Sequence, residues 1–375
     1  MKKIWIILIC AVILRLFLSF ATFHPDIDAL SKSSQFVSSG HILNLYDYSS
    51  DKLVLNYPPA IYLLFGIVNL IFSRNIPFFK LSYLPFDIFL GFLIYKLVGP
   101  KKSLLGFSFW MFNPINLYAT YMMGQFDIIP TFFTVLSLYY ALKNKLNLAA
   151  LSLGGGVTFK LYPIFLIIPL IILGKSFWKK IQLLSLAALP YLLFFLPYSQ
   201  SSNFRSNALF ANQSSKSFYA TIPVSGGESI ILFPAFLLFF YLLIITRKFE
   251  GLSLWKVYSI PLLLFFIFTH FHPQWLIWIT PFFILSLAVE KKSFLPIMLI
   301  FVSWILSLFL FDKSLTVGLF APLFPILKNT SDIWSLFNIR LDYNFSRSFL
   351  QTIFASSAAY LIYHYFSSKE WLKQQ

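Results

Sequence analysis

The 375-residue chain is too apolar to be a soluble globular protein. Hydrophobic residues make up 58% of it, charged residues only 11%, and Phe alone occurs 47 times. With a mean hydropathy of +0.77, the chain has too little polar surface to cover a water-exposed fold. Its net charge of +16 comes from short Lys and Arg clusters between apolar runs and not from a continuous basic stripe. This pattern favours membrane orientation and argues against nucleic-acid binding.

Apolar runs recur along the whole chain, and each is long enough to cross or nearly cross a bilayer. They lack the alternating polarity of barrel strands, and a backbone in hydrocarbon must satisfy its own hydrogen bonds. We therefore predict an all-α, polytopic integral membrane protein with about 10 to 12 apolar helical segments, one or two of them re-entrant. Residues 1–375 are expected to form a single transmembrane domain, whose first helix is retained and not cleaved as a signal peptide.

The positive charges predict which side each connection faces, because cytoplasmic connections retain Lys and Arg. The three longest polar connections, 23–57, 199–227 and 312–346, are expected outside. The segments 181–198, 228–246, 254–270, 275–289, 293–311 and 347–366 then alternate in direction without conflict. The clusters expected on the cytoplasmic side are Lys2/Lys3, Lys143/Lys145, Lys175/Lys179/Lys180, Arg247/Lys248, Lys291/Lys292 and Lys369/Lys372.

One early apolar segment cannot cross if the first long connection and Gly124 both face outward. Our candidate for a re-entrant segment is 104–123, because Asn113-Pro114 interrupts its middle. Lys101/Lys102 would then lie outside as an exception to the charge rule. The segment 147–173 is expected to be divided in the same way, with Lys160 toward the outer face.

Carboxylates are scarce, so those near the expected outer face can be considered one by one. Asp26-Ile27-Asp28 follows the first helix at its membrane exit. Transfer of a sugar to a hydroxyl needs a carboxylate to take the acceptor's proton, and a second one can orient the acceptor or hold a divalent cation. The alternative is that the two residues only mark the end of a helix. Asp127, at another helix start, can likewise be an N-terminal cap.

Two cations lie within apolar segments, where a charge is costly unless it reaches water or meets an anion. For Lys160, the natural anion in a membrane enzyme is a lipid phosphate. Arg15 precedes Asp26 by about three helical turns. It can either snorkel outward or bind the same anion, and both interpretations remain open.

His270, His272 and Gln274 fall at a further outer turn. A zinc site would need a third and a fourth ligand, and the chain has only five His and one Cys. Hydrogen bonding to a sugar or phosphate is therefore favoured, with Trp275 and Trp278 available for stacking on a sugar. The sequence contains no phosphate-binding P-loop and no Rossmann fingerprint, which argues against a cytoplasmic nucleotide sugar as the donor.

Taken together, these motifs resemble the GT-C superfamily of polyprenyl-phosphate-sugar transferases, most closely the catalytic subunit of GPI mannosyltransferase I and its bacterial relatives. The likeness extends over most of the chain, and the motifs occur in the family's order. The segments that carry it are Asp26-Ile27-Asp28, Phe36-Val37-Ser38-Ser39-Gly40, Asn56-Tyr57-Pro58-Pro59, Asn113-Pro114, Gly124-Gln125-Phe126-Asp127, Lys160-Leu161-Tyr162-Pro163 and Gln274-Trp275-Leu276-Ile277-Trp278.

The resemblance implies an inverting glycosyltransferase that moves mannose or a related hexose from a polyprenyl-phosphate donor to a lipid or glycan acceptor on the outer membrane face. Asp26 aligns with the family's second Asp and is the first choice for the catalytic base, with Asp28 beside it. Lys160 would neutralise the leaving phosphate. No cofactor is required, although a divalent cation at the Asp pair is compatible with the sequence. The other candidates for donor binding are Gln125, Asp127, His272, Gln274 and Arg15.

In a bacterium such an enzyme would lie in the plasma (inner) membrane with its active site facing outward. Ala29 replaces the Tyr that follows the family's Asp pair, and the later basic stretch is reduced to Arg205 and Lys216, so the acceptor does not follow from the resemblance. Membrane lipids are expected partners, and no partner subunit is indicated. The main alternative, a flippase or transporter of lipid-linked sugars, predicts inverted repeats that the sequence does not show. A whole-oligosaccharide transferase would need a large outer domain or a long cationic loop.

Overall fold

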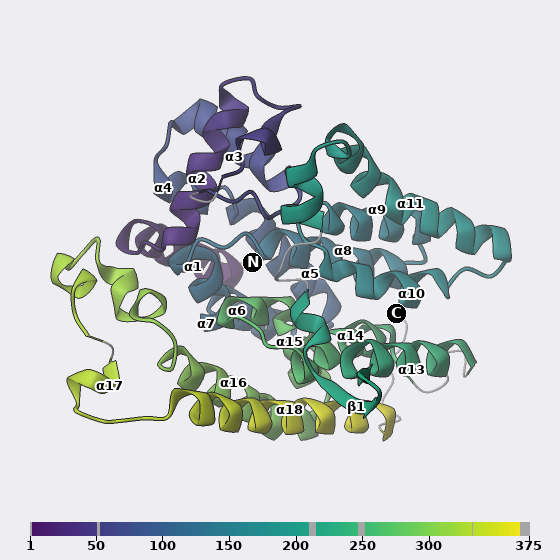
Figure 1. Ribbon diagram of the computed structural model, residues 1–375. Coiled ribbons are helices and arrows are strands. Elements are labelled where there is room, and N and C mark those ends of the chain that lie inside the picture. Colours follow the sequence, from purple (N-terminus) through teal and green to yellow (C-terminus); the bar gives the residue numbers. More distant parts are fainter. Residues whose placement is uncertain (1, 51–52, 210–214, 247–251, 332, 368–375) are drawn as a thin grey trace. The chain divides into compact units, whose positions relative to one another are not determined.

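The computed structural model describes residues 2–50, 53–209, 215–246, 252–331 and 333–367 (Figure 1). Within these ranges, four helices are long and apolar enough to cross a membrane, and seven shorter apolar helices accompany them. The four are Lys2–Ala21, Ile76–Leu97, Phe177–Tyr198 and Lys291–Leu308. The prediction of an all-α, polytopic membrane protein is therefore confirmed. The charge clusters Arg247/Lys248 and Lys369/Lys372 lie outside the described residues.

The chain forms two units, which are described separately. The first comprises Met1–Ala29, Asn75–Ile128 and His272–His364. Its helices are α1 (Lys2–Ala21), α4 (Ile76–Leu81), α5 (Leu84–Leu97), α6 (Ser103–Met111), α7 (Pro114–Asn116), the π-helix η2 (Leu117–Met122), the 3-10 helix η7 (Pro273–Trp278), α15 (Thr280–Val289), α16 (Phe294–Leu308), α17 (Ile333–Leu336), and most of α18 (Tyr343–Ser367). Short 3-10 turns lie at Lys291–Ser293, Lys313–Leu315, Val317–Phe320 and Pro325–Lys328.

The second unit comprises Leu30–Arg74, Ile129–Phe271 and Tyr365–Gln375. Its elements are most of α2 (Pro25–Ser38), η1 (Leu45–Tyr48), α3 (Pro59–Phe72), α8 (Ile128–Leu142), α9 (Leu146–Val157), η3 (Tyr162–Leu166), α10 (Ile167–Ile171), α11 (Phe177–Phe195), η4 (Leu196–Tyr198), η5 (Phe204–Leu209), η6 (Lys216–Phe218), β1 (Thr221–Ser225), β2 (Glu228–Ile231), α13 (Leu232–Thr246) and α14 (Leu254–Phe268).

Residues 103–122 run alongside α1 in the first unit and do not turn back. Arg15 donates a hydrogen bond to the carbonyl of Met111 at 2.8 Å, and Thr22 donates one to the carbonyl of Met122 at 3.1 Å. The two segments therefore advance in the same direction. The helix is interrupted at Asn113-Pro114, as predicted, because the Asn113 side chain caps a new helical turn. The expectation that this segment is re-entrant is nevertheless wrong.

The same arrangement removes the exception to the charge rule. Lys102 Nζ donates a hydrogen bond to the carbonyl of Ala288, two residues before Glu290 and three before Lys291. Lys101/Lys102 thus lie at the same end of the first unit as Lys291/Lys292, which the charge rule assigns to the cytoplasm.

The end of α1 and the start of the next long span lie close together in the first unit. Lys80, near the start of the span Ile76–Leu97, donates a hydrogen bond to the carbonyl of Thr22 at the end of α1, at 2.7 Å. Both ends of the intervening chain therefore lie at the same end of the first unit.

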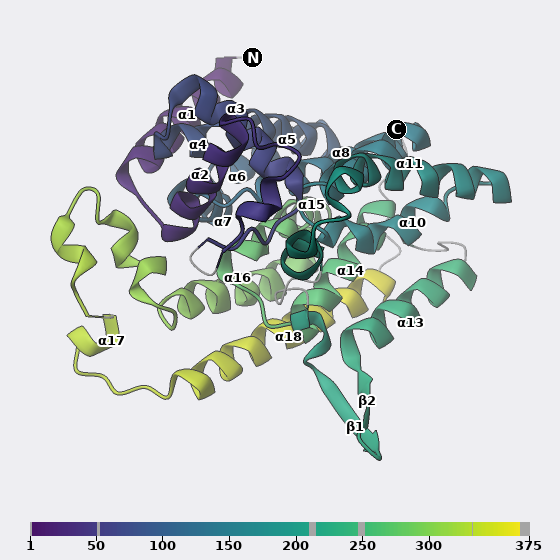
Figure 2. The ribbon, with the colours of Figure 1, turned by 45° about the horizontal axis from the view of Figure 1, so that its top comes forward.

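Two features of the second unit bear on the predicted segments. The division of 147–173 is confirmed, since α9 ends at Val157 and η3 begins at Tyr162. The segment 228–246 is not one helix, because its first residues form β2, which pairs antiparallel with β1. Every residue of both strands is exposed, and Figure 2 shows the hairpin extending beyond the end of α13.

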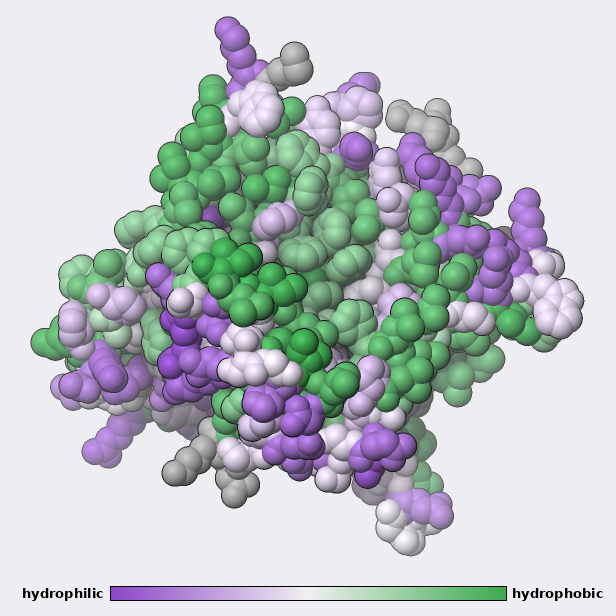
Figure 3. Space-filling view, turned by 90° about the horizontal axis from the view of Figure 1, so that it is seen from above, coloured by the Kyte–Doolittle hydropathy of each residue, from purple (hydrophilic) through white to green (hydrophobic). Residues whose placement is uncertain are grey.

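Large apolar side chains are exposed along several of these helices. On α1, the exposed fractions of Trp5, Ile9 and Phe17 are 60%, 56% and 55%. Figure 3 shows hydrophobic residues covering much of the face in view. Such exposure would be unfavourable in water and is the surface expected of helices that contact lipid.

Candidate functional site

Asp26 lies in the first turn of α2, directly after the chain leaves α1. Its Oδ2 accepts a hydrogen bond from the Gln125 side-chain amide at 2.7 Å, and 48% of its side chain is exposed. A negative charge is favourable in the first turn of a helix. A carboxylate that is held at one oxygen and remains exposed is suited to taking a proton from an acceptor hydroxyl.

His24 covers one side of Asp26. Its buried ring accepts a hydrogen bond at Nδ1 from the Asp26 backbone N–H at 3.2 Å, and Nδ1 lies 3.7 Å from Asp26 Oδ2. Burial lowers the pKa of His24 below its ordinary value of 6.5, although the neighbouring Asp26 carboxylate works in the opposite direction. Because Nδ1 accepts this hydrogen bond, the neutral form of the ring carries its proton on Nε2.

Gly124 brings Gln125 close to the start of α2. Its φ of +75° favours glycine, and a Cβ at this position would lie 2.8 Å from Cβ of Ile27. The Gly124 carbonyl accepts a hydrogen bond from the Tyr83 hydroxyl at 3.0 Å, and the Gln125 N–H donates to the Ala119 carbonyl at 2.9 Å. These two hydrogen bonds fix the backbone of Gly124 and Gln125, and so they position the Gln125 side-chain amide that binds Asp26.

We expect Gly124→Ala to lower both the unfolding temperature and sugar-transfer activity, because the added methyl group both strains the backbone and displaces Ile27 from beside Asp26. A positive φ costs about 1–2 kcal/mol, and overpacking costs about 1–3 kcal/mol. Gly99→Ala is the matched control, since Gly99 also has a positive φ, of 87°, but no atom lies within 4 Å of its added Cβ. Equal losses for the two variants in thermal unfolding and activity would show that the Ile27 contact is unimportant.

Lys80 forms hydrogen bonds with both chain segments that precede the residues of this site. Its buried ammonium group donates to the carbonyl and hydroxyl oxygens of Thr22, at 2.7 and 3.1 Å, and to the carbonyl of Met122 at 3.2 Å. Thr22 precedes Asp26 by four residues and Met122 precedes Gln125 by three. Lys80 was not among the residues predicted from sequence, although a lysine inside an apolar run is the same signal that pointed to Lys160.

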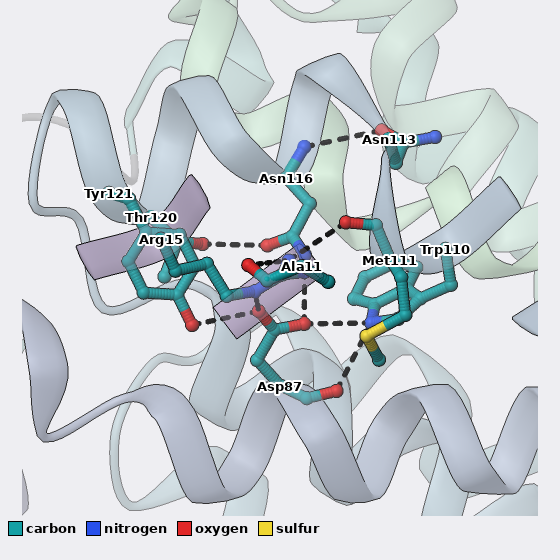
Figure 4. A network of polar contacts seen from close by, with 9 residues as sticks. All are labelled: Ala11, Arg15, Asp87, Trp110, Met111, Asn113, Asn116, Thr120 and Tyr121. Carbon is teal, nitrogen blue, oxygen red and sulfur yellow. Dashed lines mark hydrogen bonds and ion pairs between the residues drawn. The ribbon is translucent and has the colours of Figure 1, made fainter. Parts of the chain in front are cut away.

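A second polar cluster, centred on Asp87 of α5, holds η2 in place (Figure 4). Asp87 Oδ2 accepts hydrogen bonds from Arg15 Nε at 2.6 Å and the Tyr121 hydroxyl at 2.8 Å. Asp87 Oδ1 accepts from Trp110 Nε1 and Asn116 Nδ2, both at 2.8 Å. All four donors belong to residues of the first unit, and both oxygens of the buried carboxylate are satisfied.

Arg15 therefore has a role that its sequence context did not reveal. Its side chain is 0% exposed and forms an ion pair with Asp87, so of the two interpretations left open, the one in which it snorkels outward is wrong. A buried cation is stable only when it is paired with an anion. For Arg15 this anion is the Asp87 carboxylate and not the phosphate of a bound lipid. We now expect Arg15 to support the site by fixing η2 and not to contact the donor.

Asp127 is fully buried and accepts a hydrogen bond from Trp278 Nε1. Trp278 is stacked on Trp275, with ring centroids 5.2 Å apart, and Trp275 lies 5.3 Å from the half-buried His272 ring. Both tryptophans are at most 5% exposed, and their stacking on a sugar stays a prediction. We expect Asp127 to position Trp278, and His272 to be the member of this group that can reach a donor.

Gln274 fits a ligand-binding role. Its side chain is only 6% exposed, and within the described part of the chain no group donates a hydrogen bond to its Oε1. Leaving a buried carbonyl oxygen unsatisfied costs about 1–3 kcal/mol. A hydroxyl group of a bound sugar would remove that cost.

Asp28 is half-buried in the same helical turn as Asp26. Helix residues two positions apart do not face each other, so the two carboxylates are poorly placed to share one cation. Among the described residues, no group of three or more His, Cys, Asp or Glu side chains could hold a metal ion. A cation bound at Asp26 would need further ligands from its substrates or from water.

Lys160 belongs to the second unit, at the bend between α9 and η3. Its Nζ lies 5.8 Å from the centre of the Tyr57 ring, and its side chain is half-buried. Tyr57 is itself fixed, since its carbonyl accepts from the Tyr46 hydroxyl at 2.6 Å and its N–H donates to the Tyr62 hydroxyl at 3.2 Å. The lysine thus stands over an aromatic ring whose position is set by its neighbours.

No protein-family model matches the chain. Segments of it are similar to yeast proteins named GPI mannosyltransferase 1. The Candida albicans protein is 33% identical over 153 residues, which are 38% of this chain and 36% of that protein. The Kluyveromyces lactis protein is 25% identical over 184 residues (45% and 44%), and the Saccharomyces cerevisiae protein 28% over 97 residues (25% and 24%). The chain thus spans less than half the length of each of these mannosyltransferases that it matches.

Proposed function

We propose that the chain is a membrane-embedded mannosyltransferase, or a transferase of a related hexose, that uses a polyprenyl-phosphate sugar and acts on a lipid or glycan acceptor. The yeast relatives are named as mannosyltransferases, which makes mannose the first sugar to test. These relatives give no support to a bacterial inner membrane as its location. We propose that the active site faces the non-cytoplasmic side, where the charge rule places the start of α2.

The observation that carries this proposal is that segments resembling the family's motifs contact one another although they are distant in sequence. In the first unit, Asp26 is bonded to Gln125 across 99 residues, and Asp127 to Trp278 across 151. In the second unit, Lys160 lies over Tyr57. Within each unit, a charged residue of one motif thus contacts a residue of another motif.

Asp26 is proposed as the general base. The acceptor oxygen attacks the anomeric carbon as its proton moves to the Asp26 carboxylate. The bond between that carbon and the phosphate oxygen breaks, and its electron pair leaves with the polyprenyl phosphate. Attack opposite the leaving group inverts the anomeric configuration. No general acid is needed, because the leaving phosphate is already a stable anion, and stabilising its charge then supplies much of the catalysis.

Lys160 is proposed as the cation for the donor phosphate. We expect Lys160→Ala to raise the KM for the donor and to lower kcat, with a combined loss in kcat/KM of about a hundredfold, while the unfolding temperature stays nearly constant. Lys160→Arg should recover part of this loss because it keeps the charge. Steady-state kinetics with varied donor concentration provide the measurement. Full activity of Lys160→Ala would restrict Lys160 to its contact with Tyr57.

The proposed function is tested by incubating the purified chain with polyprenyl-phosphate-mannose and a total membrane lipid extract, followed by mass spectrometry. A new mannosylated lipid that requires both protein and donor supports the proposal. A flippase or transporter would instead move the donor across a vesicle membrane without forming a product. Donor translocation with no new glycolipid would therefore replace the proposed function with the transporter alternative.

A further inference from the structure

The second unit contains a cavity of about 600 Å³ that none of the proposed catalytic or donor-binding residues lines. It is formed by the chain around the start of α9 and the start of α11. Three lysines line it, Lys145, Lys175 and Lys179, together with polar side chains that include Asn147 and Ser176. Leucine side chains complete the wall, so the cavity offers both cationic and apolar contacts.

The ammonium group of Lys179 is held in place by its neighbours. Its Nζ donates hydrogen bonds to Asn147 Oδ1 at 2.7 Å and Gln182 Oε1 at 2.9 Å, while Ser176 Oγ accepts from its backbone N–H at 3.1 Å. These partners are all neutral. No acidic residue lines the cavity, and the sequence contains no Asp or Glu between Asp127 and Glu228. The lysine charges therefore converge without a carboxylate of the chain in the cavity to balance them.

The surroundings of the cavity indicate the depth of a lipid headgroup. Phe177 and Trp178, which directly follow Ser176, are 69% and 76% exposed. Exposed aromatic rings are favoured at the membrane–water interface, and Lys residues gather on its cytoplasmic side. The charge rule assigns both lysine clusters at this cavity, Lys143/Lys145 and Lys175/Lys179/Lys180, to the cytoplasm.

We propose that this cavity binds the phosphate-bearing headgroup of an anionic phospholipid in the cytoplasmic leaflet. The phosphate would lie among Lys145, Lys175 and Lys179, and the glycerol backbone and upper acyl chains would pass over the leucine side of the wall and the adjacent aromatic rings. Basic pockets on the cytoplasmic side of membrane proteins are a recognised basis for such binding. The proposal concerns the second unit alone and does not depend on the proposed transferase function.

The test uses the full chain in a neutral detergent with phosphatidylcholine, to which phosphatidylglycerol is added. Binding is measured by native mass spectrometry and by the shift in unfolding temperature. We expect the double substitution Lys145→Gln and Lys179→Gln to weaken phosphatidylglycerol binding about tenfold or more. Lys143→Gln with Lys180→Gln is the matched control, because these lysines carry the same charge in the same clusters but do not line the cavity.

Binding that falls equally in the two double variants would overturn the proposal, because it would reflect net charge and not the cavity. Inorganic phosphate that stabilises the protein as strongly as phosphatidylglycerol would overturn it too, since the site would then be one for free anions. Unfolding temperatures in phosphatidylcholine alone should match among the variants. If the double variant does not fold, Lys175→Gln alone must weaken binding, and Lys179→Arg must retain it.

Discussion

Asp26→Asn should abolish nearly all sugar transfer while leaving donor binding and folding close to normal. Asn keeps the size of the side chain and can still accept the hydrogen bond from Gln125, but its amide cannot take a proton at neutral pH. A positioned general base contributes about a hundredfold or more to the rate, and a loss of that size is expected in kcat. Product formation by mass spectrometry and donor binding by titration would separate the two effects.

Asp28→Asn is the control for this experiment. Asp28 lies two residues further along the same helix, so its side chain does not face the same side as Asp26. We expect it to retain most of the activity, with and without a chelator. Strong chelator sensitivity in the unsubstituted protein, together with equal losses for both variants, would instead indicate a cation shared by the pair. Full activity of Asp26→Asn would remove Asp26 as the base.

Asp87→Asn is expected to cause the largest loss of stability among single substitutions in the first unit. The neutral amide keeps only one acceptor oxygen for the four donors, and it leaves the fully buried Arg15 without a counter-charge. Breaking a buried ion pair by removing one partner costs about 3–5 kcal/mol. Because the Asp87 cluster also fixes Tyr121 and Asn116, activity should decline with stability. Thermal unfolding in detergent measures the first effect.

Two further variants distinguish loss of the ion pair from general damage to the first unit. Arg15→Met combined with Asp87→Asn removes both charges and should be more stable than Asp87→Asn alone, since no unpaired buried charge remains. Lys96→Gln, near the end of the same α5 helix, changes a charge outside the cluster and should be nearly neutral. A double variant that is less stable than Asp87→Asn would contradict the ion-pair explanation.

The features predicted correctly from sequence are those whose cause is local. Asn113-Pro114 predicts a helix break because the proline ring and the Asn side chain act within one turn. The bend near Lys160 follows in the same way from its neighbouring glycines and proline. The candidacy of Asp26 depended on its place after an apolar helix and on the resemblance, and its exposure is compatible with the role.

The features that were missed depend on partners far along the chain. Arg15 and Asp87 are 72 residues apart, and nothing in either neighbourhood identifies the other residue. The prediction that 104–123 is re-entrant was wrong for the same reason, because the contacts of Met111 with Arg15 and of Met122 with Thr22 span 96 and 100 residues. Trp275 and Trp278 were expected to be accessible, whereas the structure stacks the two rings on each other and buries both.

The number of residues in the π-helix η2 determines where the side chains that follow it, including Gln125, are placed. Its wider turns are closed by bonds such as that from the Met123 N–H to the Tyr118 carbonyl, five residues earlier. Deleting one residue there would restore an ordinary α-helix and rotate all that follows by about 100°, carrying Gln125 away from Asp26. A substitution at Leu117 can be accommodated by repacking of its neighbours, whereas the deletion of one residue cannot. We therefore expect this segment to tolerate changes of side chain but not of length.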